Sequence, residues 1–217
     1  MTAVIPTLNA AAVLPATLAA LGGEVRVVVA DGGSTDGTPA VALAAGVAVV
    51  AAPRGRGVQV AAGIAAARSP WLLLLHADTR LAPGWAVVAA AHMRGAPGRA
   101  GYFRFALDST DPRARRLERL VAWRCRVLAL PYGDQGLLIA REVLEVAGGM
   151  RPLPLMEDVD LVRRLGRGRL AALPAAAVTS AARWERDGWR RRSTRNLMCL
   201  ALWHAGVPAS WIARCYT

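Results

Sequence analysis

The chain has 217 residues, a length that suits one domain, or one domain with an appendage, and that can bury a sizeable core. Hydrophobic residues make up 54% of the chain and charged residues 19%, which excludes an intrinsically disordered protein. All 27 basic residues are arginine and outnumber the 15 acids; the net charge of +12 points to an anionic partner, although GC-rich codon usage gives the same excess.

Short apolar runs alternate with alanine-rich helical stretches in the first third of the chain. Strands are predicted at residues 3–6, 25–30, 47–52 and 71–76. The helices between them are predicted from an N-cap at Asn9 to residue 21, from a cap at Thr38 to a stop at Gly46, and at 58–68. This series predicts a mostly parallel sheet with helices on both faces, and ligands bind such sheets beyond the carboxyl ends of the strands.

The second half of the chain is less regular. Predicted helices and strands follow in the order helix 83–93, strand 100–105, helix 112–130, strand 137–140, helix 141–147, helix 158–165, and strands 170–173 and 178–180. The tail over 189–216 has the pattern of two amphipathic helices separated at 206–208. We therefore expect a domain over residues 1–187 and a helical tail over residues 188–217, which packs on the domain, on a partner subunit or on a membrane.

Polar loops follow the second and third predicted strands. Asp31 opens the sequence DGGSTDGT; its carboxylate can accept hydrogen bonds from a base or a ribose, and Gly33 allows close backbone approach. A plain strand-to-helix turn is the alternative for this loop. Arg54 and Arg56 lie in a loop with two glycines, which suits a diphosphate, although a solvated basic loop has the same composition.

Asp78 follows the apolar run of the fourth predicted strand and His76. A carboxylate at such a position is costly unless it is paired or binds a metal, and a hard divalent cation that bridges carboxylate and phosphate oxygens is one solution. The alternative is a helix cap, since Pro83 soon begins a helix. His76 is more simply a hydrogen-bonded core residue than a ligand.

Two further polar clusters lie in the second half. Glu157, Asp158 and Asp160 put three carboxylates in four residues at a predicted helix start, where the helix dipole alone favours acids. Apolar neighbours on both sides place part of this cluster at a partly buried edge, where a carboxylate can act as a general base. Asp134 and Gln135 lie in a polar loop that is either a turn or the lining of an acceptor pocket.

These motifs, in this order, resemble the inverting nucleotide-sugar glycosyltransferases of family 2, and among them a compact bacterial subgroup. The resemblance rests on residues 6–9, 31–38, 76–78 and 157–158, and it extends over about residues 2–187. It implies an α/β GT-A fold, with a Rossmann-like, mostly parallel mixed sheet flanked by helices. It also implies metal-assisted inverting transfer of a sugar from a nucleoside diphosphate, commonly UDP, to an acceptor hydroxyl.

The resemblance also implies roles for individual residues. Asp158 matches the catalytic base, with Glu157 beside it, and Asp78 matches the last acid of the DxD motif, which holds Mn²⁺ or Mg²⁺. The implied nucleotide-binding residues are Pro6, Thr7, Asn9, Asp31, Gly33, Arg54, Arg56, Ala77 and Arg183. The implied acceptor-binding residues are Asp134, Gln135 and Trp184.

Two positions depart from the family pattern. His76 stands where the DxD motif begins with an aspartate, so the ribose contact made there is missing or altered and weak metal binding is expected. Ala61 replaces an asparagine that often follows the Arg56 loop. The sequence predicts neither the donor sugar nor the acceptor.

The tail combines tryptophans with arginines, as a helix on an anionic membrane does. The residues concerned are Trp184, Trp189, Trp203, Trp211 and the triplet 190–192. Packing on the domain or in a homodimer would require the same composition. Membrane docking predicts a lipid-linked acceptor at the inner face of the membrane.

A cytoplasmic location is expected because the three cysteines are widely spaced and form no CxxC pair, so that neither a disulfide framework nor a zinc site is indicated. The uncharged first 23 residues lack a basic segment and are interrupted by prolines, so no signal peptide is expected. The longest later uncharged run, 38–53, is too short to span a bilayer.

Three alternatives compete with the glycosyltransferase. A sugar nucleotidyltransferase would favour a glycine-rich loop after the first strand, where this chain has the sequence PTLN. A nucleic-acid-binding protein would interleave aromatic residues with its basic ones. Of the seven tryptophans, only Trp123 lies in the arginine-rich stretch 113–126. No nucleic acid is therefore expected as a partner. A catalytically inactive, nucleotide-sugar-binding member of the same fold is suggested by His76.

Overall fold

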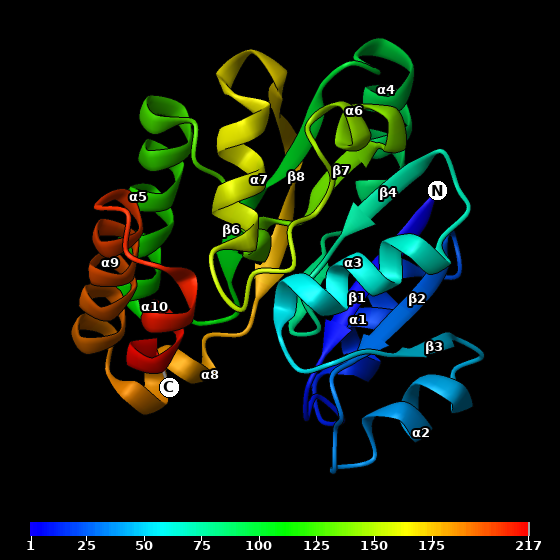
Figure 1. Ribbon diagram of the computed structural model, residues 1–217, viewed down its shortest axis with the longest axis horizontal. Coiled ribbons are helices and arrows are strands. Elements are labelled where there is room, and N and C mark those ends of the chain that lie inside the picture. The colour runs from blue at the N-terminus through cyan, green and yellow to red at the C-terminus, as the bar shows by residue number, and fades with distance from the viewer. Residues whose placement is uncertain (217) are drawn as a thin grey trace.

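The computed structural model describes residues 1–216. Eight strands in these residues form one mixed sheet in the order β3-β2-β1-β4-β7-β6-β8-β5 (Figure 1). Strands β1 to β4 pair in parallel with one another, β7 runs antiparallel between β4 and β6, and β5 pairs antiparallel with β8. The strands are β1 Thr2–Thr7, β2 Arg26–Asp31, β3 Ala48–Ala51, β4 Trp71–Leu74, β5 Thr79–Leu81, β6 Ala100–Leu107, β7 Leu137–Ala140 and β8 Leu170–Thr179.

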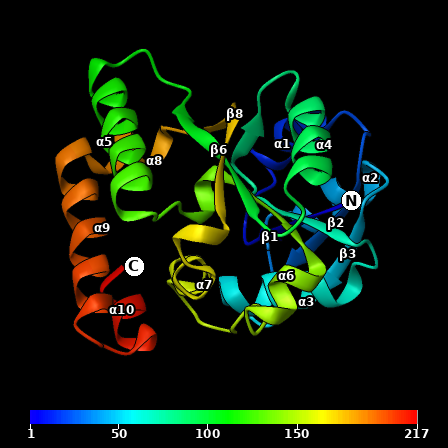
Figure 2. The same cartoon turned by 90° about the horizontal axis from the view of Figure 1, so that it is seen from above.

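Helices cover both faces of the sheet, as Figures 1 and 2 show. Helices α1, α2 and α4 pack over one hydrophobic cluster, and α3, α6 and α7 lie on the other face. The helices are α1 Leu14–Leu21, α2 Thr38–Ala44, α3 Arg56–Ala66, α4 Trp85–Gly95, α5 Pro112–Leu128, α6 Arg141–Val146, α7 Glu157–Leu165, α8 Ala182–Asp187, α9 Trp189–His204 and α10 Ala209–Tyr216, with 3₁₀ turns at Gly133–Gln135 and Arg167–Arg169.

The central strands are apolar because both of their faces are covered. Val4 and Ile5 in β1 and Leu72 and Leu73 in β4 are fully buried, on alternating sides of the sheet. Burying each of these side chains stabilises the fold by about 1.5–3 kcal/mol. The parallel register brings the carboxyl ends of β1, β2 and β4 to one edge, and this edge holds the polar motifs.

Strand β8 differs from the prediction of two separate strands at 170–173 and 178–180. It is one strand of ten residues whose register against β6 shifts between Phe103 and Arg104. Pro174 lies in this irregularity, where no hydrogen bond of the sheet needs its missing N–H group. The proline therefore does not interrupt the strand, although the sequence prediction placed a break there. The three-residue strand β5, which pairs with β8, was missed because it is too short to show a period.

Two predicted helix caps are wrong. Asn9 adopts a left-handed conformation (φ 51°), and α1 begins five residues later, at Leu14. The Asn9 side chain instead accepts a hydrogen bond from the Thr35 N–H at 2.9 Å and so joins two loops at the sheet edge. Helix α2 is capped by Gly37 rather than Thr38, which is its first residue. Such loop-to-loop contacts cannot be read from local sequence.

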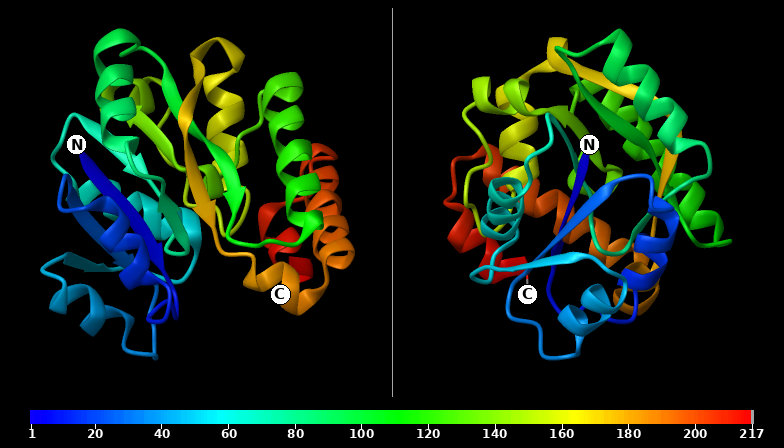
Figure 3. Two further views of the ribbon diagram at one scale, coloured as in Figure 1. Left: turned by 180° about the vertical axis from the view of Figure 1, so that it is seen from behind. Right: turned by 90° about the vertical axis from the view of Figure 1, so that its right-hand side faces the viewer.

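The tail helices pack against α5, α7 and the end of the sheet (Figure 3). Trp184 and Trp189 join a cluster with residues of β6 and α5, and Cys199 and Ile212 join one with Val159 of α7. Residue 217 of the predicted tail lies outside the described residues. Among residues 1–216, no helix has the length and apolar character needed to cross a bilayer.

Candidate active site

Asp31, at the end of β2, organises the loop that follows. Its carboxylate accepts hydrogen bonds from the Thr7 and Ser34 hydroxyls and from the backbone N–H groups of Gly33 (3.1 Å) and Ser34 (2.8 Å). Burial opposes the charge, but these hydrogen bonds outweigh it and lower the pKa of Asp31. Because the four bonds occupy about all the lone-pair sites of a carboxylate, contact with a nucleotide base would require one hydroxyl to turn away.

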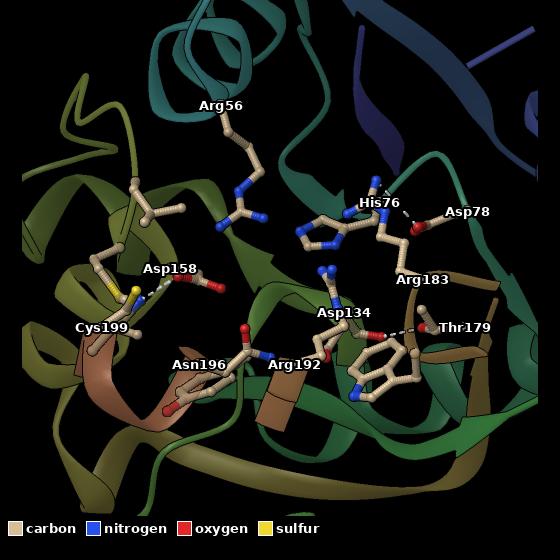
Figure 4. Close-up of a pocket in the computed structure, with 15 residues that line it drawn as sticks. Arg56, His76, Asp78, Asp134, Asp158, Thr179, Arg183, Arg192, Asn196 and Cys199 are labelled. Carbon is tan, nitrogen blue, oxygen red and sulfur yellow. Dashed lines mark hydrogen bonds and ion pairs between the residues drawn. The ribbon is translucent and has the colours of Figure 1, made fainter. Parts of the chain in front are cut away.

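A cavity of about 100 Å³ lies at the edge of the sheet, between the domain and the tail (Figure 4). Six of the predicted site residues line it, namely Arg56, Asp78, Asp134, Asp158, Arg183 and Trp184. They come from α3, the β4–β5 turn, the 3₁₀ turn before β7, α7 and α8. Residues distant in the sequence therefore meet at the place where the strand order predicts a ligand.

Asp158 lies in the first turn of α7 and faces this cavity (Figure 4). One of its carboxylate oxygens accepts a hydrogen bond from the Gly133 N–H at 2.7 Å, and the other accepts one from the Val159 N–H at 2.8 Å. Burial opposes ionisation, but the Arg56 guanidinium and the Gly133 N–H outweigh burial and hold the pKa of Asp158 below its ordinary value. Asp158 is therefore ionised at neutral pH, as a general base must be.

Glu157 does not line the cavity and forms an ion pair with Arg56. It is 2% exposed, and burial raises its pKa against the effect of the Arg56 charge. Arg56 itself is partly exposed and lines the cavity, so its guanidinium lies between Glu157 and the space in front of Asp158. Glu157 thus positions Arg56 rather than reaching a ligand.

His76 lies next to Asp158, across the turn at Gly133. A Cβ atom added to Gly133 would be 2.5 Å from His76 Nε2 and 3.2 Å from Asp158 Oδ2. A glycine is therefore required at position 133 for the turn to pack against the side chains of His76 and Asp158. Burial of the ring, together with the Arg56 charge, lowers the pKa of His76 to about 4. The residue in place of the first DxD acid is thus a neutral imidazole.

Asp78 and Arg183 lie across the cavity from Asp158 (Figure 4), with their charged atoms 3.7 Å apart. No group of three or more His, Cys, Asp and Glu residues among those described can enclose a metal ion. A magnesium-type ion, however, needs only one or two carboxylates when substrate phosphates supply further oxygens. The partly exposed Asp78 carboxylate fits such a substrate-bridged cation.

Asp134 lies between these two sides of the cavity (Figure 4). Its backbone carbonyl accepts a hydrogen bond from Thr179 Oγ1 at 3.0 Å, which holds the 3₁₀ turn against β8. Burial, with the negative charges of Asp158 and Asp78, raises the pKa of Asp134 to about 6, although Arg124 opposes the shift. The charge of Asp134 therefore changes near pH 6.

This raised pKa gives Asp134→Asn an expected effect on stability. The folded-state pKa exceeds the unfolded value of 3.8, so the Asp134 carboxylate destabilises the fold at pH 7.5; this cost shrinks as the pH falls below 6 and disappears only below the unfolded pKa. Asp134→Asn should raise the Tm by about 5–10 °C at pH 7.5 and by about half as much at pH 5, measured by calorimetry. Asp36→Asn is the control: the pKa of Asp36 is lowered by hydrogen bonds from Thr38, so its loss should lower the Tm. Equal Tm gains for Asp134→Asn at both pH values would contradict the prediction.

The other nine predicted site residues do not line the cavity; they are Pro6, Thr7, Asn9, Asp31, Gly33, Arg54, Ala77, Gln135 and Glu157. The Gln135 side chain is buried and bonds the Phe103 carbonyl (3.0 Å) and the Tyr132 N–H (3.2 Å), so it holds the turn in place. Arg54 is exposed on the loop before α3. The Ala77 carbonyl accepts a hydrogen bond from the Thr17 hydroxyl at 2.7 Å, which holds the β4–β5 turn against α1.

The sequence prediction missed the cavity wall that the tail provides. Helix α9 contributes Arg192, Asn196 and Cys199, and Tyr132 and Thr179 add further lining. The Arg192 guanidinium lies 5.1 Å from the centre of the Trp184 ring and forms an ion pair with Asp187 at 2.8 Å. The spacing of Arg192, Asn196 and Cys199 places them on one face of a helix, and this was the signal that could have found them.

Comparison with known proteins adds a sequence and a structural likeness. The sequence profile of glycosyl transferase family 2 matches residues 2–117. Relatives named as uncharacterized glycosyltransferases, from Mycobacterium bovis and Mycobacterium tuberculosis, are 42% identical over 85 residues. The matched region spans 39% of this chain and 39% of each relative, well under two thirds of their length.

Two solved structures show the same arrangement of elements. Glucosyl-3-phosphoglycerate synthase from Mycobacterium tuberculosis, with Mn²⁺ and UDP-glucose, superposes with a TM-score of 0.66 at 20% identity, over 95% of this chain and 79% of that one. S. aureus TarS, with UDP-GlcNAc, gives a TM-score of 0.64 at 15% identity, over 82% of this chain and 58% of that one. These likenesses confirm the predicted α/β fold, a mostly parallel mixed sheet with flanking helices and C-terminal helices.

Proposed function

Since its profile match covers more than half of the residues, the chain belongs to glycosyl transferase family 2; on that premise we propose that it transfers a sugar from a UDP-linked donor to an acceptor hydroxyl in one inverting displacement. Membership of this family favours a glycosyltransferase over the nucleotidyltransferase alternative. The observation that supports the proposal most is that one cavity holds an ionised Asp158 facing Asp78 and Arg183.

In the proposed reaction the acceptor hydroxyl gives its proton to Asp158. The hydroxyl oxygen forms a bond to the anomeric carbon while the bond from that carbon to the diphosphate oxygen breaks, and the electron pair leaves with the nucleoside diphosphate. Attack from the face opposite the leaving group inverts the anomeric carbon. Arg183 and Arg56, on the cavity wall, stabilise the charge that develops on the leaving diphosphate.

A divalent cation completes this assignment. The structural neighbours contain Mn²⁺ or Mg²⁺ together with UDP. We assign the corresponding ion to Asp78; when bound, it supplies positive charge beside the donor diphosphate. The nucleotide itself is assigned to the edge formed by the loops after β1 and β2, with Pro6, Thr7, Asn9, Asp31 and Gly33.

UDP binding should therefore depend on metal and on Asp78. With Mn²⁺ and UDP at about 100 times its Kd, the Tm should rise by about 5–10 °C in a thermal-shift measurement. Asp78→Asn should lose the metal-dependent part of this rise. Glu142→Gln, an exposed carboxylate on α6, should retain it. If no nucleotide diphosphate stabilises the parent protein with or without metal, the proposed function is wrong.

We also propose that the tail docks on an anionic membrane surface and brings a lipid-linked acceptor to the cavity. Trp211 is 65% exposed on α10, and Leu197 and Met198 are exposed on α9, which also presents Arg190 and Arg191 to solvent. Exposed apolar side chains beside arginines are what interfacial binding requires. A homodimer interface is the competing use of this surface.

The membrane proposal predicts co-flotation with phosphatidylglycerol vesicles at about 50 mM salt and release at about 500 mM, because the Debye length shortens. Trp211→Ser should reduce the bound fraction several-fold. Leu43→Ser is the control: Leu43 is also exposed, but it lies on α2, at the end of the molecule away from α9 (Figure 1). Flotation that is absent, or equal with neutral vesicles, would contradict membrane docking.

A further inference from the structure

Apart from the arginines, three buried polar side-chain atoms of the cavity lining have no hydrogen-bond partner within residues 1–216. They are Asp134 Oδ1, Trp184 Nε1 and Asn196 Oδ1. Native proteins pair nearly all such atoms, and an unpaired one costs about 1–3 kcal/mol. Three in one cavity indicate groups that a ligand satisfies.

The three atoms belong to three different elements that converge beside Asp158. Asp134 lies in the 3₁₀ turn before β7, Trp184 in α8 and Asn196 in α9. Figure 4 shows Asn196 and Arg192 on the side of the cavity opposite Arg56, with Asp134 between the two sides. This end is distinct from the Asp78 and Arg183 side, to which the donor diphosphate is assigned.

The chemistry of these atoms selects the ligand class. Trp184 supplies an N–H donor, Asp134 supplies an acceptor, and the Asn196 amide can present either of its ends. A hydroxyl group can both accept from Trp184 and donate to Asp134 or Asn196, whereas a phosphate or carboxylate can only accept. An anion would meet the Asp134 carboxylate, whereas the Arg192 guanidinium already has an ion-pair partner in Asp187 at 2.8 Å, a carboxylate that Arg186 and Arg195 share.

The apolar part of the cavity lining agrees with this class. It consists of Tyr132, Leu155, Met156, Val159 and Cys199, which suits the C–H face of a sugar or polyol.

We propose that Trp184 and Asn196, with Asp134, form an acceptor subsite for an uncharged, polyhydroxylated group, a sugar or a polyol. One of its hydroxyls faces Asp158 and is the attacking group. The assignment of Trp184 and Asp134 to an acceptor rests on the proposed function; the role of Asn196 and the uncharged polyol class go beyond it. Helix α9 of the tail is thereby part of the active site.

Saturation-transfer NMR on the full chain tests the proposal, with Mg²⁺ and UDP present. The probes are glycerol, myo-inositol and methyl α-glucoside, with glycerol 3-phosphate as the anionic counterpart. At least one neutral probe should bind more tightly than glycerol 3-phosphate. Trp184→Phe, which keeps an aromatic ring and removes the N–H, should weaken that binding about three- to tenfold, as should Asn196→Ala.

Controls separate the subsite from the fold and from the donor site. Trp123→Phe, at a half-exposed position of α5, should leave probe binding unchanged, and UDP signals in the same samples should be equal for all variants. Tighter binding of glycerol 3-phosphate than of every neutral probe overturns the ligand class. Neutral binding that both site variants leave intact overturns the subsite, as does the absence of binding by any probe. A missing UDP signal in the parent overturns the donor assignment instead, and Trp184-dependent polyol binding then still supports the subsite.

Discussion

Asp158→Asn is expected to lower kcat by about 10²–10⁴-fold while UDP still binds, because the amide cannot take the proton of the acceptor hydroxyl. The variant keeps the size of the side chain, and its oxygen can still accept the hydrogen bond from the Gly133 N–H. The 3₁₀ turn therefore stays in place. Turnover is measured as UDP release from a panel of UDP-sugars in the presence of Mn²⁺ and candidate acceptors, and UDP affinity is measured by calorimetry.

Asp160→Asn is the matched control for this experiment. Asp160 lies two residues further along α7, is buried, and forms ion pairs with Arg151 at 3.0 Å and Arg164 at 2.8 Å. Its substitution should lower the free energy of unfolding by about 1–3 kcal/mol and leave kcat within a few-fold of the parent value. Unchanged turnover in Asp158→Asn would contradict the base assignment. A parent protein that binds UDP but turns over no donor would support the inactive, donor-binding alternative.

Arg56→Gln is expected to lower kcat/KM by about 10–10³-fold. Arg56 is the largest favourable influence on the Asp158 charge and one of two arginines assigned to the leaving diphosphate. Without it the pKa of Asp158 rises. Since the base must be ionised, the acidic limb of the pH–rate profile should move to higher pH, as a pH series of kcat/KM would show.

The same substitution leaves Glu157 buried without its ion-pair partner. Removing one member of a buried pair costs about 3–5 kcal/mol, and the partial exposure of Arg56 reduces this to about 1–3 kcal/mol. Glu157→Gln, added to Arg56→Gln, should restore stability without restoring activity, because only the unpaired carboxyl is removed. Arg54→Gln, which changes an exposed arginine two residues away, should alter neither quantity. Equal losses for the Arg54 and Arg56 variants would contradict the assignment.

Local sequence signals predicted the first half of the fold better than the second. Apolar runs such as 25–30 and 71–76 are central strands, because a strand buried on both faces needs a continuous apolar sequence. Where neighbours decide, the prediction was wrong: Pro174 lies inside β8 at an irregularity opposite β6, and Asn9 bonds Thr35 instead of capping α1. A proline or an asparagine has the same local preference in either setting.

The candidate site shows the same division. Asp78 and Asp158 were found from the sequence because a charged residue at the edge of an apolar segment is costly without a function or a partner. The assignment of Glu157 beside the base, in contrast, missed its partner: its carboxylate bonds Arg56, a contact that spans 101 positions in the chain. The Gln135 side chain likewise donates a hydrogen bond to the Phe103 carbonyl, a contact that the residues near Gln135 in the sequence do not predict.

The sequence by itself determined the alternating elements and the acids at the ends of the strands, because periodicity, turn chemistry and the cost of a buried charge act over a few neighbouring residues. The resemblance of its motifs to a known family pointed to the family. Only the tertiary structure decided what those acids do. It made Asp31 the acceptor for four donors of its own loop, gave Asp158 a charge partner and raised the pKa of Asp134 to about 6. It also placed Asn196 of the tail in the wall of the cavity, because burial, distance and charge pairing depend on residues that only folding brings together.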